Sequence, residues 1–258
     1  MQGGQEPRRF SERTALAALI VRHRRTGQLD RLANLHRSFW SGRSATRFHE
    51  HTNHRFDTVF RKRHYPIVAQ LQALIGESGI DTLCEIGGGS GQVLEHLAEC
   101  MPNLRRLIGI DLSADQVAGN RVRNRDPRCE FICADALNWA AANASGGWAW
   151  FCYGGVLEFL PQRRLADSLR ACAAKPPALF ALVEPLADDF DCDCEIVSRH
   201  FGLELTSSHP YSKMLIDAGF SEVWRMETRS LGYRWLLSIA RCSRVAGAPV
   251  AGNQASVS

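Results

Sequence analysis

Short apolar runs alternate with amphipathic segments through most of the chain, and this alternation predicts the fold. Apolar runs of strand length, which recur between segments of helical spacing, occupy residues 83–86, 107–110, 131–133, 148–153 and 179–183. Two further β-like runs, 223–227 and 233–240, are joined by a short turn that contains Gly232. The pattern predicts an α/β protein with an open seven-stranded, mostly parallel sheet, helices on both faces and an antiparallel last strand.

The first 76 residues follow a different pattern, with helical spacing of apolar residues and no strand-like run. We predict helices beginning at Ser11, near Leu32 and near Phe48. The domain prediction is therefore a basic helical N-terminal cap or arm over residues 1–76 and an α/β domain over 77–244. Residues 245–258 are rich in Ala, Gly and Ser and are expected to form a flexible tail.

Charge is distributed unevenly between these parts. Residues 1–64 hold 14 Lys+Arg against 5 Asp+Glu, a net charge of +9, and the remainder holds 17 against 22, a net charge of −5. Six of the nine histidines also lie in the first 64 residues. Two interpretations stay open: an arm or lid that meets an anionic partner, and a solvated helical face.

Cysteines and hydropathy indicate the compartment. The nine cysteines are odd in number and scattered, mostly inside apolar runs, so we expect buried thiols in a reducing cytoplasm and no disulfide framework. No apolar run reaches membrane-spanning length, and the first residues lack the apolar core of a signal peptide. These features predict a cytoplasmic protein without a membrane partner.

A glycine loop follows the first apolar run of the α/β domain. Gly87, Gly89 and Gly91 fall at alternate positions, and helical spacing begins at Gln92. Glycines in such a turn let a ligand approach the backbone, and the N-terminus of the next helix offers free N–H groups. A dinucleotide site needs a glycine or alanine at the sixth position of the loop, where this chain has Gln92, so an NAD oxidoreductase is disfavoured.

The sequence Glu85-x-Gly87-x-Gly89-x-Gly91 resembles motif I of the class I S-adenosylmethionine-dependent methyltransferases. Acids follow the second and third predicted strands, in register with this motif. By resemblance, the methionine end of S-adenosylmethionine lies near Glu85 and the methyl-donor side near Tyr153 and Gly154. The predicted cofactor-binding residues are Glu85, Gly87, Gly88, Gly89, Gly91, Asp111, Leu112, Asp135, Ala136, Tyr153 and Gly154.

The acids have two interpretations each. Asp111, 20 residues past Gly91, can accept hydrogen bonds from both ribose hydroxyls, as in other adenosine sites. The resemblance implies that Asp135 accepts from the adenine amine, that Ala136 offers its N–H and that Leu112 covers the adenine face. Alternatively, Asp111 caps a helix and Asp135 forms a turn.

Motifs that are missing narrow the methyl acceptor. The chain lacks the [DN]-P-P-[YF] segment of base-amine methyltransferases, the Pro-Cys nucleophile of cytosine-C5 enzymes and the acids of the metal-dependent catechol type, so no metal is expected. Residues 155–161 resemble a stretch of small-molecule methyltransferases, although Phe159 replaces the usual His. The remaining candidates for catalysis are His209, His54 and Tyr153.

The predicted function is metal-independent methyl transfer from S-adenosylmethionine to an oxygen or nitrogen of a small-molecule acceptor. For the His-rich segment 49–54, a lid, a metal site and a polar helix face are all possible. Two rivals remain: an RNA methyltransferase that uses the basic N-terminal arm, and a non-catalytic subunit that binds S-adenosylmethionine.

Overall fold

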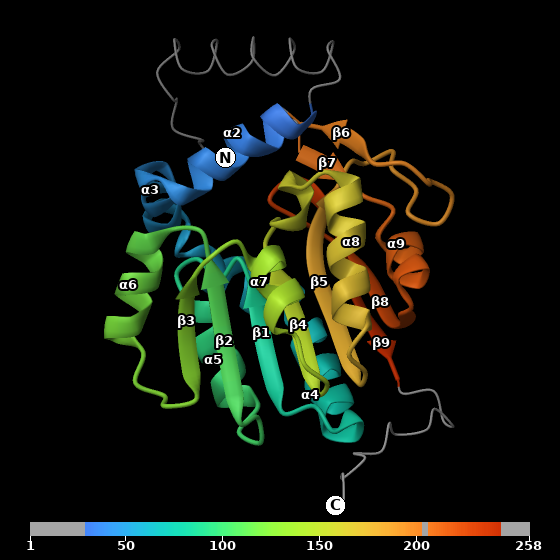
Figure 1. Ribbon diagram of the computed structural model, residues 1–258. Coiled ribbons are helices and arrows are strands. Elements are labelled where there is room, and N and C mark those ends of the chain that lie inside the picture. Colours follow the sequence, from blue (N-terminus) through green and yellow to red (C-terminus); the bar gives the residue numbers. More distant parts are fainter. Residues whose placement is uncertain (1–28, 203–205, 244–258) are drawn as a thin grey trace, which may run out of the picture.

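The computed structural model describes residues 29–202 and 206–243, and its centre is a seven-stranded sheet (Figure 1). The strand order is β3-β2-β1-β4-β5-β9-β8, in which β9 pairs antiparallel with both neighbours and the first five strands are parallel. The predicted sheet and its antiparallel last strand are therefore confirmed. The strands are β1 Thr82–Ile86, β2 Arg106–Asp111, β3 Cys129–Cys133, β4 Trp148–Tyr153, β5 Ala178–Leu186, β8 Ser221–Ser230 and β9 Tyr233–Cys242.

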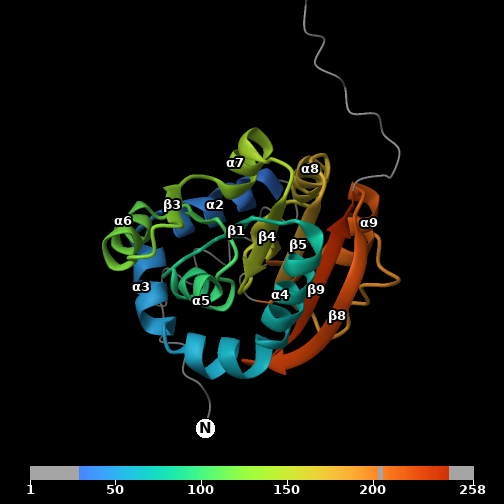
Figure 2. The same ribbon diagram turned by 90° about the horizontal axis from the view of Figure 1, so that it is seen from below.

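Helices cover both faces of the sheet, as Figure 2 shows from below. One face packs against α4 Pro66–Ser78, α5 Gln92–Cys100 and α6 Ala114–Arg123. The other face packs against α7 Ala136–Asn143, α8 Gln162–Ala173 and α9 Tyr211–Ala218. Strands β1, β4 and β5 are buried along their length apart from Tyr153, because apolar side chains on both of their faces meet helices.

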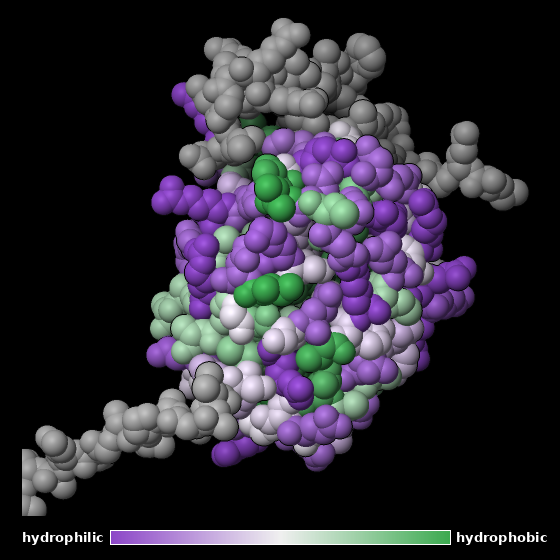
Figure 3. Space-filling view, turned by 90° about the vertical axis from the view of Figure 1, so that its right-hand side faces the viewer, coloured by the Kyte–Doolittle hydropathy of each residue, from purple (hydrophilic) through white to green (hydrophobic). Residues whose placement is uncertain are grey.

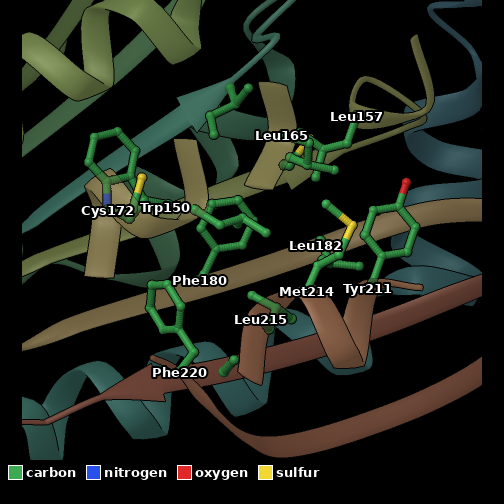
Figure 4. Packing of buried hydrophobic residues seen from close by; sticks show 14 of the residues in the cluster. Trp150, Leu157, Leu165, Cys172, Phe180, Leu182, Tyr211, Met214, Leu215 and Phe220 are labelled. Carbon is green, nitrogen blue, oxygen red and sulfur yellow. The ribbon is translucent and has the colours of Figure 1, made fainter. Parts of the chain in front are cut away.

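The core on the second face brings together distant parts of the chain. Figure 4 shows Trp150 and Phe180 of the sheet packed with Leu165 of α8, Leu215 of α9 and Phe220. Each of these side chains is at most 3% exposed. This packing joins strands β4 and β5 to α8 and α9 in one core.

Three helices before the sheet form a unit that we call the cap: α2 Leu29–Ser41, α3 Arg43–Thr52 and the π-helix η1 Phe56–His64. Figure 1 shows α2 and α3 lying across the end of the sheet where the parallel strands finish. The predicted helix after Ser11 and the predicted tail over 245–258 lie outside the described residues. What the structure describes of the first 76 residues is helical, with Pro66 at the first position of α4.

Two small elements were not predicted from the sequence. A 3₁₀ turn, η2 Leu157–Phe159, follows β4, and a two-stranded sheet pairs β6 Arg199–Phe201 with β7 Thr206–Ser208. Their three-residue length gives too few positions for a hydrophobic period to be recognised. Both lie near the carboxyl end of the central strands, where they shape the surroundings of the site.

The surface and the cysteines agree with ordinary globular packing. On the face drawn in Figure 3, hydrophobic residues form separate groups among hydrophilic ones. All nine cysteines are free thiols. Within the described part of the chain, no helix is both long and apolar enough to cross a membrane.

Candidate functional site

The glycine loop joins β1 to α5 and is tied to the neighbouring strand. The N–H groups of Gly87 and Gly88 both donate to the carbonyl of Ile110 at the end of β2, at 2.8 and 3.0 Å. Gly87, Gly89 and Gly91 have φ angles of +76°, +46° and +77°. These left-handed conformations favour glycine, which explains the alternate spacing in the sequence.

The loop is also covered closely by side chains. A Cβ atom at Gly87 would lie 2.5 Å from Val156 Cγ2, and one at Gly89 would lie 2.6 Å from His49 Cε1. Val156 belongs to the loop after β4, and His49 belongs to cap helix α3. The glycines therefore permit two distant segments to approach the loop backbone.

Two side chains of α6 that the sequence interpretation missed hold this loop. Asn120 is buried, and its Nδ2 donates to the Gly89 carbonyl at 2.9 Å. Arg123 donates to the Ser90 carbonyl at 2.7 Å and to the Asn120 side chain. One signal for Asn120 was present, because it lies three residues after Val117 on the apolar face of the helix.

Asp111 lies at the end of β2, as predicted, and its carboxylate shapes the loop. One oxygen accepts from the Gly89 N–H at 2.9 Å, and the other accepts from the Ser113 N–H at 2.8 Å. Ser113 itself caps α6 by accepting from the Gln116 N–H. A carboxylate oxygen can accept more than one hydrogen bond, so ribose hydroxyls can share these oxygens.

Asp135 caps α7 and is paired with two arginines. Its carboxylate accepts from the Asn138 N–H at 3.1 Å and forms ion pairs with Arg164 of α8 at 2.5 Å and Arg37 of the cap at 2.9 Å. Burial opposes ionisation, but these hydrogen bonds and cations lower its pKa below the usual value. Ala136 follows as the first residue of α7. Both interpretations of Asp135 remain compatible with this geometry.

Glu85 is the one residue of motif I whose side chain is left incompletely paired. It is 2% exposed, and its Oε2 has no hydrogen-bond partner within the described structure. A Cβ atom at Gly88 would lie 3.3 Å from this oxygen, so it faces the loop backbone. Burial, and then the charge of Asp111, raise the pKa of Glu85 to about 8. A buried acceptor of this kind fits a cationic or N–H ligand group.

The remaining predicted contacts lie on neighbouring strand ends. Leu112 is partly buried after β2, and its carbonyl lies 3.7 Å from Cys133 Sγ. Gly154 is exposed after β4 and has a φ angle of +88°. The structure thus brings Glu85, the glycine loop and Asp111 into contact. Leu112 follows β2, Asp135 follows β3, and Tyr153 is the last residue of β4.

The cap contacts the loop after β4 through aromatic rings. Trp40 and His36 of α2 have ring centroids 5.3 and 5.0 Å from that of Phe159. Trp40 also lies 5.1 Å from Phe48, in edge-to-face geometry. Together with the ion pair of Arg37 and Asp135, these contacts fasten the cap across the strand ends.

Tyr153 extends from the end of β4 to the cap. Its hydroxyl lies 3.2 Å from His64 Nδ1, and His64 Nε2 lies 3.1 Å from the Ser230 hydroxyl of β8. Burial lowers the pKa of His64 to about 4 and raises the pKa of Tyr153. The two side chains therefore form a neutral hydrogen-bonded pair near neutral pH.

The two predicted catalytic histidines occupy different settings. His54 is exposed in the turn that follows the cap helix α3. His209 is fully buried, and its Nε2 lies 3.1 Å from the Leu157 carbonyl, which can only accept. Its Nδ1, 2.5 Å from Ser198 Oγ, is then the accepting nitrogen. Burial lowers the pKa of His209 to about 4, so this imidazole is a neutral link between η2 and the segment before α9.

Glu184 at the end of β5 fixes the loop that carries η2. Its Oε1 accepts from the N–H groups of Val156 and Leu157 at 3.0 and 3.1 Å, and its Oε2 accepts from Glu158 N–H at 3.2 Å. The Tyr211 hydroxyl also donates to Oε2 at 3.3 Å. This buried carboxyl explains how a glycine-containing loop keeps one conformation beside the site.

These observations fit S-adenosylmethionine. Glu85 offers an unpartnered buried oxygen, the glycine backbone can be approached closely, and acids end β2 and meet the start of α7. As for a metal, no group of three or more His, Cys, Asp or Glu that could hold an ion occurs among the residues described. The expectation of metal-independent chemistry stays a prediction.

Comparisons with known proteins agree with the geometry of the site. Residues 83–175 match the family model of a methyltransferase domain. The magnesium protoporphyrin IX methyltransferase of Synechocystis PCC 6803, solved with bound SAM, is 16% identical and superposes with a TM-score of 0.55 over 81% of this chain and 97% of its own. No curated protein matches the sequence.

A second solved structure covers still more of the chain. The 1,6-didemethyltoxoflavin-N1-methyltransferase of Burkholderia thailandensis, solved with its substrate and S-adenosylhomocysteine, is 14% identical, with a TM-score of 0.53 over 94% of each chain. At such identities the superposition shows a shared fold, while the matched domain and motif I identify the activity and the cofactor. Residues 83–175 thus form a methyltransferase domain, and the chain shares the fold of these S-adenosylmethionine-binding methyltransferases.

Proposed function

We propose that this enzyme transfers a methyl group to an oxygen or nitrogen of a small-molecule acceptor held between the cap and the strand ends. The main support for this proposal is that the cap contacts four separate parts of the sheet edge. Its partners are Gly89 after β1, Asp135 after β3, Tyr153 at the end of β4 with Phe159 in the loop that follows, and Ser230 of β8. A site covered in this way suits a small acceptor better than a polymer.

In this proposal the chain's residues divide the work by position. S-adenosylmethionine supplies an electrophilic methyl group. Glu85 receives the amino end of the cofactor, Asp111 the ribose, and Asp135 with Ala136 the adenine. Leu112 covers the adenine face, and the glycine backbone leaves room for the cofactor. The cap keeps water away from the methyl group.

Tyr153 and His64 are proposed to orient the acceptor at the end of β4. The Tyr153 hydroxyl can hydrogen-bond an acceptor oxygen or nitrogen, and neutral His64 on its far side can take part in moving the acceptor's proton. Tyr153 thus keeps its predicted place among the catalytic candidates. His209 is proposed as a positioning residue for η2, because both of its ring nitrogens are engaged. His54 is proposed to lie outside the chemistry because it is exposed.

The likeness to known small-molecule enzymes supports the acceptor class. The two solved structures compared above are named for magnesium protoporphyrin IX and 1,6-didemethyltoxoflavin. We also infer action in the cytoplasm, because nine free thiols suit a reducing compartment.

Methyl transfer from labelled donor into a fractionated cell extract tests this proposal. The purified enzyme should label the fraction of low molecular mass, and Tyr153→Phe should lower the labelling at least tenfold without weakening S-adenosylhomocysteine binding. Labelling of the RNA fraction would favour the rival function of the basic arm. Cofactor binding without labelling of any fraction would favour the non-catalytic subunit.

A further inference from the structure

Arg55 is a partly buried cation without an acidic partner. It lies between α3 and η1, and within the described structure no carboxylate forms an ion pair with it and no acceptor takes a hydrogen bond from its guanidinium. Six other partly buried arginines each form an ion pair with an aspartate or glutamate: Arg106, Arg128, Arg164, Arg199, Arg225 and Arg234. The exception besides Arg55 is Arg241 at the other end of the sheet.

The position of Arg55 indicates what kind of ligand group could be its missing partner. Its Cζ lies 5.7 Å from the centroid of the Phe48 ring, and its charge interacts with the Tyr153 and Tyr233 hydroxyls. Tyr153 is the proposed acceptor-orienting residue, so the charge of Arg55 acts in the same region. Burial lowers the pKa of Arg55, which is the sign of a cation that has lost water without gaining a counter-charge.

An aromatic wall leads from Arg55 to the loop after β4. Phe48 contacts Trp40 at 5.1 Å between ring centroids, and Trp40 contacts Phe159 at 5.3 Å. The wall therefore runs from the cation across the cap to η2. Edge-to-face aromatic rings beside a guanidinium suit a planar ring that carries a negative group, because stacking and a charge-assisted hydrogen bond can act together.

We propose that Arg55 binds the anionic group, a carboxylate, of a planar aromatic methyl acceptor that lies along the wall formed by Phe48, Trp40 and Phe159. This inference rests on the proposed function, since it names the acceptor class for the same site. Arg55 is then a residue that determines specificity, and it selects acids over neutral analogues.

Paired acids and amides test the selection. The full-length protein is titrated calorimetrically with salicylate, anthranilate and indole-3-carboxylate, and with the three corresponding amides, each with and without saturating S-adenosylhomocysteine. We expect at least one acid to bind the wild type about tenfold more tightly than its amide, equivalent to about 1.4 kcal/mol. Arg55→Gln should remove this preference, and Arg55→Lys should retain part of it.

Arg241→Gln is the matched control, because Arg241 is also partly buried and unpaired but lies at the opposite edge of the sheet. It should leave the preference unchanged. Equal or undetectable binding of acids and amides to the wild type, or a preference that survives Arg55→Gln, would overturn the inference. S-adenosylhomocysteine affinity is measured separately for every variant, so loss of cofactor binding counts against the proposed function alone.

Discussion

Glu85 in β1 and Glu184 in β5 are both buried glutamates, two strands apart in the sheet, yet their carboxyls have opposite surroundings. Glu184 accepts from three backbone N–H groups, from the Tyr211 hydroxyl and from Cys152 Sγ. Glu85 retains an oxygen without a partner, directed at the glycine loop. Burial raises the pKa of both groups.

The difference separates a structural acid from one prepared for a ligand. A buried carboxyl with filled acceptor positions holds a loop in place, and its removal leaves donors without partners. A buried carboxyl with an empty position makes the folded protein less stable until a ligand group supplies the missing contact. Beside the loop after β4, the protein itself supplies the partners of the buried carboxyl. Beside the glycine loop, one acceptor position of the buried carboxyl is left for a ligand.

The largest effect is expected from Glu184→Gln. An amide cannot accept at both positions, so its NH₂ group would oppose N–H or O–H donors wherever it points, and we expect the free energy of unfolding to fall by about 3 kcal/mol. Urea unfolding at pH 7 measures the loss. Glu77→Gln, on an exposed position of α4, should change stability by less than about 0.5 kcal/mol. A loss below about 1 kcal/mol for Glu184→Gln would contradict a structural role.

Glu85→Gln should give the reverse pattern. The folded protein should lose no stability at pH 7, because the replaced oxygen has no partner, while S-adenosylhomocysteine binding should weaken about tenfold, or about 1.4 kcal/mol. Calorimetric titration measures the affinity, and Glu99→Gln on the exposed side of α5 is the control. Unchanged affinity together with lost stability would place Glu85 in the same class as Glu184.

The pH dependence of stability sharpens the contrast. Because folding raises the pKa of Glu85 from 4.5 to about 8, the folded state keeps its proton where the unfolded chain has released it, so stability declines as pH rises across this range, by up to about 1.4 kcal/mol per pH unit. Urea midpoints from pH 6.5 to 8.5 should fall less steeply for Glu85→Gln. Parallel slopes for the two proteins would show that Glu85 is already ionised in the folded state.

The smallest effects on stability are expected from two adjacent residues of β4 that face different ways. Cys152→Ala removes a donor from Glu184 and should lower stability by about 1 kcal/mol without changing cofactor affinity. Tyr153→Phe removes the contact with His64, with a similar or smaller loss of stability, and should lower the rate of methyl transfer. Equal catalytic losses in both variants would mean that the two sides of β4 are not functionally distinct.

Local pattern was sufficient for the sheet and for part of the site. Each predicted strand is present, and motif I forms the expected loop, because glycine is required wherever φ is positive and apolar periods reflect burial on each element. The acids Asp111 and Asp135 also occupy the expected strand ends. The cofactor could therefore be predicted from motifs whose residues are close together in the sequence.

Only the tertiary structure decided which residues each histidine contacts. The segment 49–54 looked uniform, yet His49 contacts Gly89 and His54 is exposed, while His209, a candidate base, is closed between Ser198 and the Leu157 carbonyl. The pairs His64 with Tyr153 and Arg37 with Asp135 join residues 89 and 98 positions apart. Such pairs produce no periodic pattern in the local sequence, because the free energy of each contact depends on how the cap packs on the sheet. The sequence by itself determined the elements and the cofactor, and packing between distant segments decided the surroundings of the acceptor.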